Sequence, residues 1–217
     1  MKTPSPVDDT ILKQMVDAYE HHPDGRPLFC RDMNALRKLP RLEVAIQNVR
    51  FSPINGKRYG HQWPIRDDTL REAEAKLQDA KEEIRTARDF DELHDIVQRE
   101  TGGLPGIGDL AVYDFALRIG AFRRKEPKRV YLHAGSAEGA RLLGFEGPTV
   151  DPEEFQEPIR RLKSAGIEDF LCRLATAVKD TASKGLKARL RELWINNGSH
   201  ASTQKTSRGA VLPRKAD

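Results

Sequence analysis

The stretch GGLPGIGDLAVYDFALRIG, residues 102–120, decides how this chain folds. Its first seven residues contain four glycines and a proline, and the residues after them are nearly all apolar helix formers. The apolar positions of this second part are Leu110, Ala111, Val112, Tyr113, Phe115, Ala116, Leu117 and Ile119. A helix that is apolar nearly all round is buried, so we expect it to anchor the glycine turn to the core. Asp114 and Arg118 interrupt it, four residues apart in the order that favours an ion pair.

The helix before the glycine turn has a clear start and a clear end. Asp89 is placed to cap it, and Glu92 follows three residues later, as a capping box requires. Phe90, Leu93 and Val97 give this helix one apolar face, and the glycines at 102 and 103 end it. The sequence therefore predicts two helices joined by a short glycine turn.

The glycine turn is chemically suited to a phosphate group. Gly106 and Gly108 place no side chain where the two helices approach, and they leave backbone amides uncovered at the helix start near Asp109. Free amides and the positive end of a helix dipole favour an anion. Such contacts hold a nucleic acid backbone without reading its sequence.

The rest of the chain predicts an all-α protein. Apolar residues make up 38% and charged residues 32% of its 217 residues, and β-branched runs are scarce. We expect further helices over residues 9–20, from 31 to about 50 with a break near Pro40, and over 67–87 as one apolar stripe. Two more should start at Asp151, where Pro158 ends the helix early, and near residue 166. The segment between 51 and 65 reads as a loop.

The pattern helix, LPGIG, helix resembles the helix-hairpin-helix motif of DNA repair and recombination proteins. In that family the hairpin amides bind DNA phosphate, often together with a monovalent cation. The resemblance implies a DNA-binding hairpin formed by Leu104, Pro105, Gly106, Ile107, Gly108 and Asp109. We expect no other cofactor than such a cation.

A wider resemblance is to the DNA glycosylases built on this hairpin. Their pattern L-P-G-V-G-x-K-T-A, followed by V-D-T-H-V and R-L-G, is similar to LPGIGDLAV, VYLHAG and RLLG in this chain. The resemblance implies a glycosylase-like helical bundle. The lyase lysine of the pattern, however, falls at Leu110 and the catalytic aspartate at Tyr131, so the ordinary mechanism is not expected. Displaced carboxylates to consider are Asp114, Asp109 and Glu138, each of which is better explained as an ion pair or a helix start.

Two further groups of residues could help to hold DNA. The cations of RRKEPKR, namely Arg123, Arg124, Lys125, Lys128 and Arg129, would grip phosphates flanking the hairpin, or would form a solvated loop. Tyr131 and His133 alternate and so share one side of an extended segment, where they could contact a base or a phosphate. The structural alternative, which we favour, is that Tyr131 packs in the core and His133 caps a backbone carbonyl.

The segment GKRYGHQWPI, residues 56–65, mixes basic and aromatic side chains, which suits single strands or distorted duplex. We favour the simpler interpretation that its aromatics pin the loop to the core. The residues His21, His22, Cys30 and His61 have no spacing typical of metal ligands, and we expect no metal site.

Charge and cysteine usage suggest the partners and the compartment. The net charge is +4, and residues 181–217 carry eight Lys and Arg against Glu192 and Asp217. This basic tail fits an acidic partner such as nucleic acid, or simply keeps the chain soluble. The first ten residues lack the apolar core of a secretory signal, no apolar run is long enough for a membrane span, and Cys30 and Cys172 are far apart. We therefore expect a cytoplasmic protein with reduced thiols.

Together these features predict four regions and one function. Residues 1–8 should be a flexible N-terminus, 9–66 helices and a loop that pack on the core, 67–180 the helix-hairpin-helix domain, and 181–217 a partly disordered basic tail. The expected function is DNA binding with little sequence preference, in repair or processing. The alternatives are an active glycosylase or lyase with a relocated carboxylate, and a protein-interaction module in which the hairpin is only structural.

Overall fold

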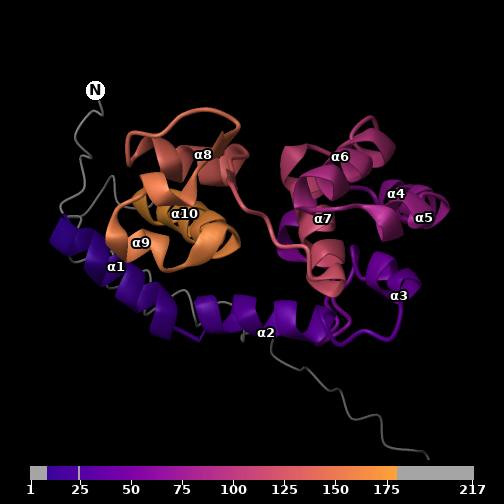
Figure 1. Cartoon of the computed structure of the whole chain (residues 1–217), viewed down its shortest axis with the longest axis horizontal. Coiled ribbons are helices and arrows are strands. Elements are labelled where there is room, and N and C mark those ends of the chain that lie inside the picture. Colours follow the sequence, from indigo (N-terminus) through magenta and orange to yellow (C-terminus); the bar gives the residue numbers. More distant parts are fainter. Residues whose placement is uncertain (1–8, 24, 180–217) are drawn as a thin grey trace, which may run out of the picture.

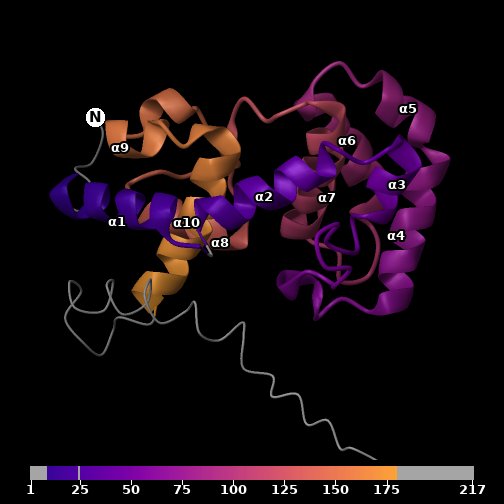
Figure 2. The same cartoon turned by 90° about the horizontal axis from the view of Figure 1, so that it is seen from below.

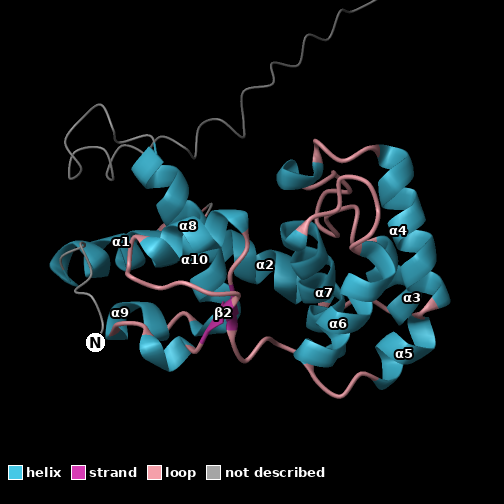
Figure 3. Cartoon of the chain, turned by 90° about the horizontal axis from the view of Figure 1, so that it is seen from above, coloured by secondary structure: helices cyan, strands magenta, loops and turns pink. Residues whose placement is uncertain are grey.

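The computed structural model describes residues 9–23 and 25–179, and these are mainly helical (Figures 1 and 3). The prediction of an all-α protein is confirmed, with one small addition: β1 (Val130–Tyr131) and β2 (Thr149–Val150) pair antiparallel in a two-stranded sheet. The helices are α1 (Asp9–His21), α2 (Arg26–Leu36), α3 (Leu42–Gln47), α4 (Asp67–Asp79), α5 (Lys81–Thr86), α6 (Phe90–Thr101), α7 (Asp109–Arg123), α8 (Ala134–Arg141), α9 (Glu157–Arg160) and α10 (Lys163–Lys179). Short 3-10 turns lie at Gly60–Gln62 and Pro152–Glu154.

The helices gather in two lobes, each with its own apolar core (Figure 1). The first core extends from Met33 in α2 to Ala121 at the end of α7, and includes α3 to α6. The second core joins α1 to β1, α8, β2, α9 and α10. Helix α2 runs along both lobes (Figure 2). The boundaries expected at 66 and 67 therefore do not match this division, because α1 packs with the C-terminal helices. The expected regions 1–8 and 181–217 lie outside the described residues.

Some helix boundaries differ from the predictions for local reasons. The single helix expected over 67–87 is two, because the chain breaks at Ala80 between α4 and α5. The helix expected from Asp151 is only a 3-10 turn, whose cap is the Asp151 side chain accepting from the Glu153 amide at 2.9 Å. Pro158 does not end a helix but stands in the first turn of α9, where its missing N–H costs nothing.

Helices α6 and α7 form the predicted pair around the glycine turn. Asp89 caps α6 as expected, since its carboxylate accepts from the Glu92 amide at 3.0 Å. The Glu92 carboxylate turns back to the amide of Arg88, one residue earlier than a capping box requires. Helix α7 is buried along almost its whole length, including Arg118 at 2% exposure. None of the described helices is both long and apolar enough to cross a membrane.

Candidate nucleic-acid interface

The turn between α6 and α7 is fixed by its own bonds and by two apolar side chains. Ile107 is 7% exposed and lies in the first core, with Leu104 packed against it. The Leu104 amide donates to the Thr101 carbonyl at 3.0 Å, and the Ile107 amide donates to the Leu104 carbonyl at 3.0 Å. Gly106 has a φ of +84°, a left-handed conformation that side chains rarely adopt. The turn is therefore a rigid projection from the core.

The two glycines of the turn serve different purposes, and neither is there to let two helices touch. A Cβ built on Gly108 meets nothing within 4 Å, and one built on Gly106 meets only Ile65, at 4.0 Å. The expectation of a close helix approach at these residues is therefore wrong. Gly106 is required by its positive φ, whereas Gly108 is extended, with φ −110° and ψ −179°, which any residue adopts. The fold does not need a glycine at position 108. Because Gly108 has no side chain, the backbone amides at the start of α7 stay uncovered.

Only some of the hairpin amides can face a ligand. The amides of Leu104 and Ile107 are used inside the turn, so the expectation that these two also bind phosphate is corrected. Within the described part of the chain, no hydrogen bond uses the amides of Gly106, Gly108 or Asp109. The last two of these amides stand at the positive end of the fifteen-residue helix α7.

The loop 51–66 lies beside the turn, because Ile65 is the side chain nearest to Gly106. Trp63, two residues before Ile65, is 72% exposed, although tryptophan is mostly buried in proteins. Lys57 and Arg66 in the same loop are exposed as well. The expectation that the loop's aromatics pin it to the core therefore holds for Tyr59, which is partly buried, and fails for Trp63.

A buried polar network ties this loop to α7. Asp114 forms the predicted ion pair with Arg118, and its Oδ2 also lies 2.6 Å from Nε2 of His61 in the loop. The Arg118 guanidinium donates to the Val49 carbonyl at 3.0 Å and lies 3.3 Å from the ring centroid of Tyr59. Burial acts to raise the pKa of Asp114, but the charges of Arg118 and His61 outweigh it and hold that pKa below its usual value. Asp114 thus forms the ion pair expected from the sequence and also connects α7 to the loop through His61.

The basic loop RRKEPKR does not flank the hairpin, and that prediction is wrong. Arg123 ends α7 and Asp109 begins it, so about 21 Å of helix separates the two at 1.5 Å per residue. Arg123 donates to the Arg85 carbonyl in α5, and Lys125 donates to the Arg88 carbonyl in the link between α5 and α6. Arg129 donates to Thr149 in β2 at 2.8 Å, whereas Arg124 and Lys128 are exposed.

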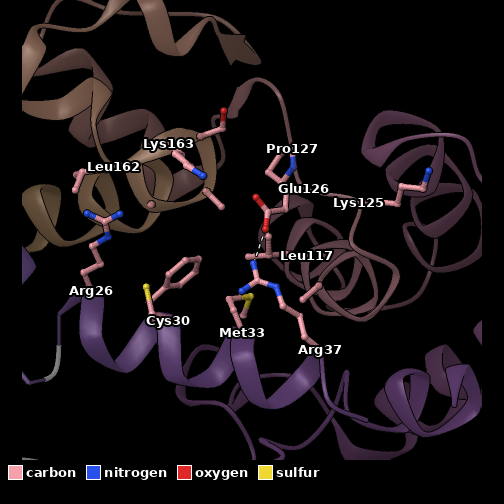
Figure 4. A pocket seen from close by; sticks show the side chains of 15 residues that line it. Arg26, Cys30, Met33, Arg37, Leu117, Lys125, Glu126, Pro127, Leu162 and Lys163 are labelled. Carbon is pink, nitrogen blue, oxygen red and sulfur yellow. Dashed lines mark hydrogen bonds and ion pairs between the residues drawn. The ribbon is translucent and has the colours of Figure 1, made fainter. Parts of the chain in front are cut away.

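Part of the basic loop lines a cavity of about 190 Å³ between the lobes (Figure 4). Its walls come from α2, the end of α7 and the start of α10. Glu126 of the loop forms an ion pair with Arg37 of α2, and the two side chains face each other in Figure 4. Glu126 therefore ties the loop to the end of α2, and Glu126 and Pro127 line this cavity instead of lying at the hairpin.

Tyr131 and His133 lie in the interior between the lobes. Tyr131 is partly buried, as the favoured interpretation holds: its ring centroid lies 5.5 Å from that of Tyr113, and its hydroxyl donates to Asp91 at 2.7 Å. His133 is 4% exposed, so it is not a surface contact for DNA. Its Nε2 faces the Glu168 carboxylate at 2.6 Å rather than capping a carbonyl.

The remaining displaced carboxylates are not gathered at one site. Asp109 is exposed at the start of α7, and Glu138 lies in α8 of the other lobe. The carboxylate that reaches Tyr131, where the glycosylase pattern has its aspartate, is Asp91 of α6. The sequence did not single out Asp91, because by position alone it is an acidic residue in the first turn of a helix.

A second group that the sequence did not reveal is the set His133, Glu168 and Cys172. Glu168 and Cys172 stand four residues apart on α10, and the Cys172 thiol donates to Glu168 at 3.1 Å. Burial, with the adjacent Glu168 charge, raises the pKa of the Cys172 thiol, which makes it a poor free nucleophile. A glutamate and a cysteine four residues apart in α10 were the signal that could have found this group.

Comparisons with known proteins give no further assignment. Searches of protein-family models, of curated proteins and of solved structures found no match to this chain. The likeness to helix-hairpin-helix proteins therefore depends on the residues and geometry of the chain itself.

Proposed function

We propose that this protein binds the DNA backbone through the turn between α6 and α7, used as a helix-hairpin-helix, with little sequence preference. The observation that carries the proposal is Gly108. Its conformation and surroundings would accept any side chain, yet it is glycine and leaves its own amide and that of Asp109 open at the start of α7. Helix N-termini with free amides bind phosphate groups.

The rigidity of the turn supports this proposal. Ile107 is buried in the first core, and α7 is enclosed on nearly every side, so the amides are held in place before a phosphate arrives. A pre-ordered donor loses less conformational entropy on binding. An interaction module that merely joined two helices would have no need of uncovered amides at an exposed tip.

The loop 51–66 supplies a second kind of contact next to the turn. The exposed indole of Trp63 can stack on an unpaired base, and Lys57 and Arg66 provide positive charge. The proposed DNA surface therefore consists of the turn and this loop. The cations of the basic loop at 123–129 lie at the other end of α7 and are not part of it.

We propose binding rather than base excision. Leu110 and Tyr131 stand where the glycosylase pattern has its lysine and aspartate, and neither side chain can perform that chemistry. Asp114, the best placed of the displaced carboxylates in α7, is already engaged by Arg118 and His61.

The test is a matched pair of substitutions at Gly108. Gly108→Asp and Gly108→Asn give side chains of the same shape that can cap α7 in the same way, and they differ only in charge. The affinity of each full-length protein for a short duplex of arbitrary sequence is measured by fluorescence anisotropy. We expect Gly108→Asp to weaken binding at least tenfold relative to Gly108→Asn, because its carboxylate repels the phosphate.

The same substitutions should leave the fold intact. Neither side chain meets an atom within 4 Å at its Cβ, and asparagine or aspartate is a better N-cap than glycine by a few tenths of a kcal/mol. Equal affinities of the two variants, or no DNA binding by the parent protein, would overturn the proposal.

A further inference from the structure

The residues His133, Glu168 and Cys172 bring three metal-ligating atoms together where the second lobe meets the first. The Nε2 of His133 lies 2.6 Å from Oε1 of Glu168, and the Sγ of Cys172 lies 3.1 Å from the same oxygen. One ligand atom from each residue lies within 4.8 Å of the others. Among the residues that the structure describes, this is the one group of three His, Cys, Asp or Glu side chains so arranged.

Close packing of α8 against α10 creates this arrangement. His133 immediately precedes α8, and Glu168 and Cys172 project from successive turns of α10. A Cβ built on Gly139 of α8 would lie only 2.1 Å from the Leu171 carbonyl oxygen, and one on Gly135 would lie 3.0 Å from the Cys172 sulfur. The two helices thus approach each other more closely than side chains at these positions would permit.

The imidazole of His133 is buried beside Glu168 and Tyr113. It is 4% exposed, its Nε2 faces the Glu168 carboxylate at 2.6 Å, and its side chain takes part in the capping box with Ser136 at the start of α8. Among the described residues, the hydroxyl of Tyr113 has no hydrogen-bond partner, although it is buried and its ring centroid lies 5.4 Å from that of His133. Buried polar groups are nearly always paired, so the Tyr113 hydroxyl fits a further polar group bound beside these three residues.

We propose that His133, Glu168 and Cys172 bind a divalent transition-metal ion, and that this ion is Zn²⁺. One imidazole nitrogen, one carboxylate oxygen and one sulfur match the mixed ligands of tetrahedral zinc. Ligand atoms about 2.0 to 2.3 Å from such an ion are roughly 3.3 to 3.6 Å apart. The distances of 2.6 and 3.1 Å to the Glu168 oxygen therefore need to widen by less than about 1 Å.

The ion would link β1 and the start of α8 to α10. Cys172 binds as the thiolate, and its proton is released to solvent when the metal enters. Three protein ligands leave the fourth tetrahedral position for a water molecule. The Tyr113 hydroxyl, which is buried and has no hydrogen bond to another described residue, is the partner that we assign to that water. This proposal is independent of DNA binding by the hairpin.

The test uses Co²⁺ as a spectroscopic substitute for zinc. The full-length protein, reduced and freed of metal, is titrated with Co²⁺ while its absorption spectrum is recorded. We expect saturation at one equivalent, with the visible bands of tetrahedral cobalt and a thiolate-to-metal band in the near ultraviolet. Cys172→Ser should abolish the thiolate band and weaken binding at least tenfold, whereas Cys30→Ser, at an exposed cysteine in α2, should change neither.

A second measurement avoids dependence on the folding of a variant. The alkylation rates of the two cysteines in the parent protein are followed by mass spectrometry with and without one equivalent of Zn²⁺. Zinc should slow the reaction of Cys172 at least tenfold and leave that of Cys30 unchanged. Absence of the thiolate band in the parent, its loss in Cys30→Ser but not in Cys172→Ser, or unchanged alkylation of Cys172 would overturn the proposal.

Discussion

Replacing Asp114 by asparagine should destabilise the protein strongly, because the Asp114 carboxylate compensates the charge of a buried arginine. Asp114 is the only acid among the described residues that forms an ion pair with Arg118, whose side chain is 3% exposed. Asparagine keeps the shape but removes the charge that compensates this guanidinium. His61 loses its partner in the same change.

The magnitude follows from the burial of Arg118. Removing one partner of a buried ion pair costs about 3–5 kcal/mol, because the other charge is left uncompensated. The Val49 carbonyl and the Tyr59 ring still contact Arg118, and the asparagine oxygen can still accept from it. We therefore expect Asp114→Asn to lose about 3 kcal/mol of unfolding free energy, near the lower limit of that range, and Asp114→Ala to lose more. A domain of this kind has a total stability of roughly 5–15 kcal/mol.

The assay is urea unfolding at several pH values. The folded-state pKa of Asp114 lies below its ordinary value of 3.8, so the carboxylate stabilises the fold above that pH and loses its effect as the pH falls through the folded-state pKa. The difference in unfolding free energy between the parent and Asp114→Asn should therefore have its full value at pH 7 and should shrink only below about pH 4.

A matched control for this prediction is Asp17→Asn in α1. Asp17 pairs with Lys13 and Arg161 at the surface, where an ion pair contributes at most about 1 kcal/mol. The interpretation that Asp114 compensates the buried charge of Arg118 would be refuted by either of two results. One is a smaller loss of unfolding free energy in Asp114→Asn than in Asp17→Asn at pH 7. The other is a loss in Asp114→Asn that does not depend on pH.

Two further predictions concern the helix packing and the DNA surface. Gly139→Ala should lower the free energy of unfolding by about 2–3 kcal/mol, because the new Cβ would lie 2.1 Å from the Leu171 carbonyl oxygen. The control Gly103→Ala places its Cβ in open space and should change the free energy by less than about 0.5 kcal/mol in the same urea titration. Trp63→Ala should leave the stability within about 0.5 kcal/mol of the parent but weaken binding of a single-stranded oligonucleotide by about 1–3 kcal/mol in fluorescence anisotropy. Unchanged affinity of the Trp63 variant would remove the loop from the proposed surface.

The sequence predicted the features that depend on residues close together in the chain, such as helix ends, apolar helix faces and ion pairs within one helix. The pattern of Asp89, the apolar face of α6 and the glycines at 102 and 103 gave that helix to within a residue or two. The apolar run after Gly108 correctly predicted a buried helix, and the spacing of Asp114 and Arg118 predicted their ion pair. Each of these features involves residues within a few positions of each other.

The features that were missed depend on contacts far apart in the chain. The position of RRKEPKR relative to the hairpin follows from the length and direction of α7. The carbonyl groups that accept from Arg123 and Lys125 lie in α5 and in the link between α5 and α6. His133 approaches Glu168 because α8 packs closely against α10. Gly139 permits this packing, since a Cβ at that position would lie too near the Leu171 carbonyl oxygen. No periodicity within one helix contains that information.

The most direct test of the central claim is a titration of the ¹⁵N-labelled full-length protein with a short DNA duplex, monitored by amide NMR. We expect the amide resonances of Gly108 and Asp109, which bond to no described group, to shift first and most. The amides of Leu104 and Ile107, already bonded within the turn, should shift less, and Gly108→Asp should abolish the response of the turn. Shifts confined to residues 181–217, with the turn unaffected at saturation, would contradict the claim and assign the DNA contact to the basic tail.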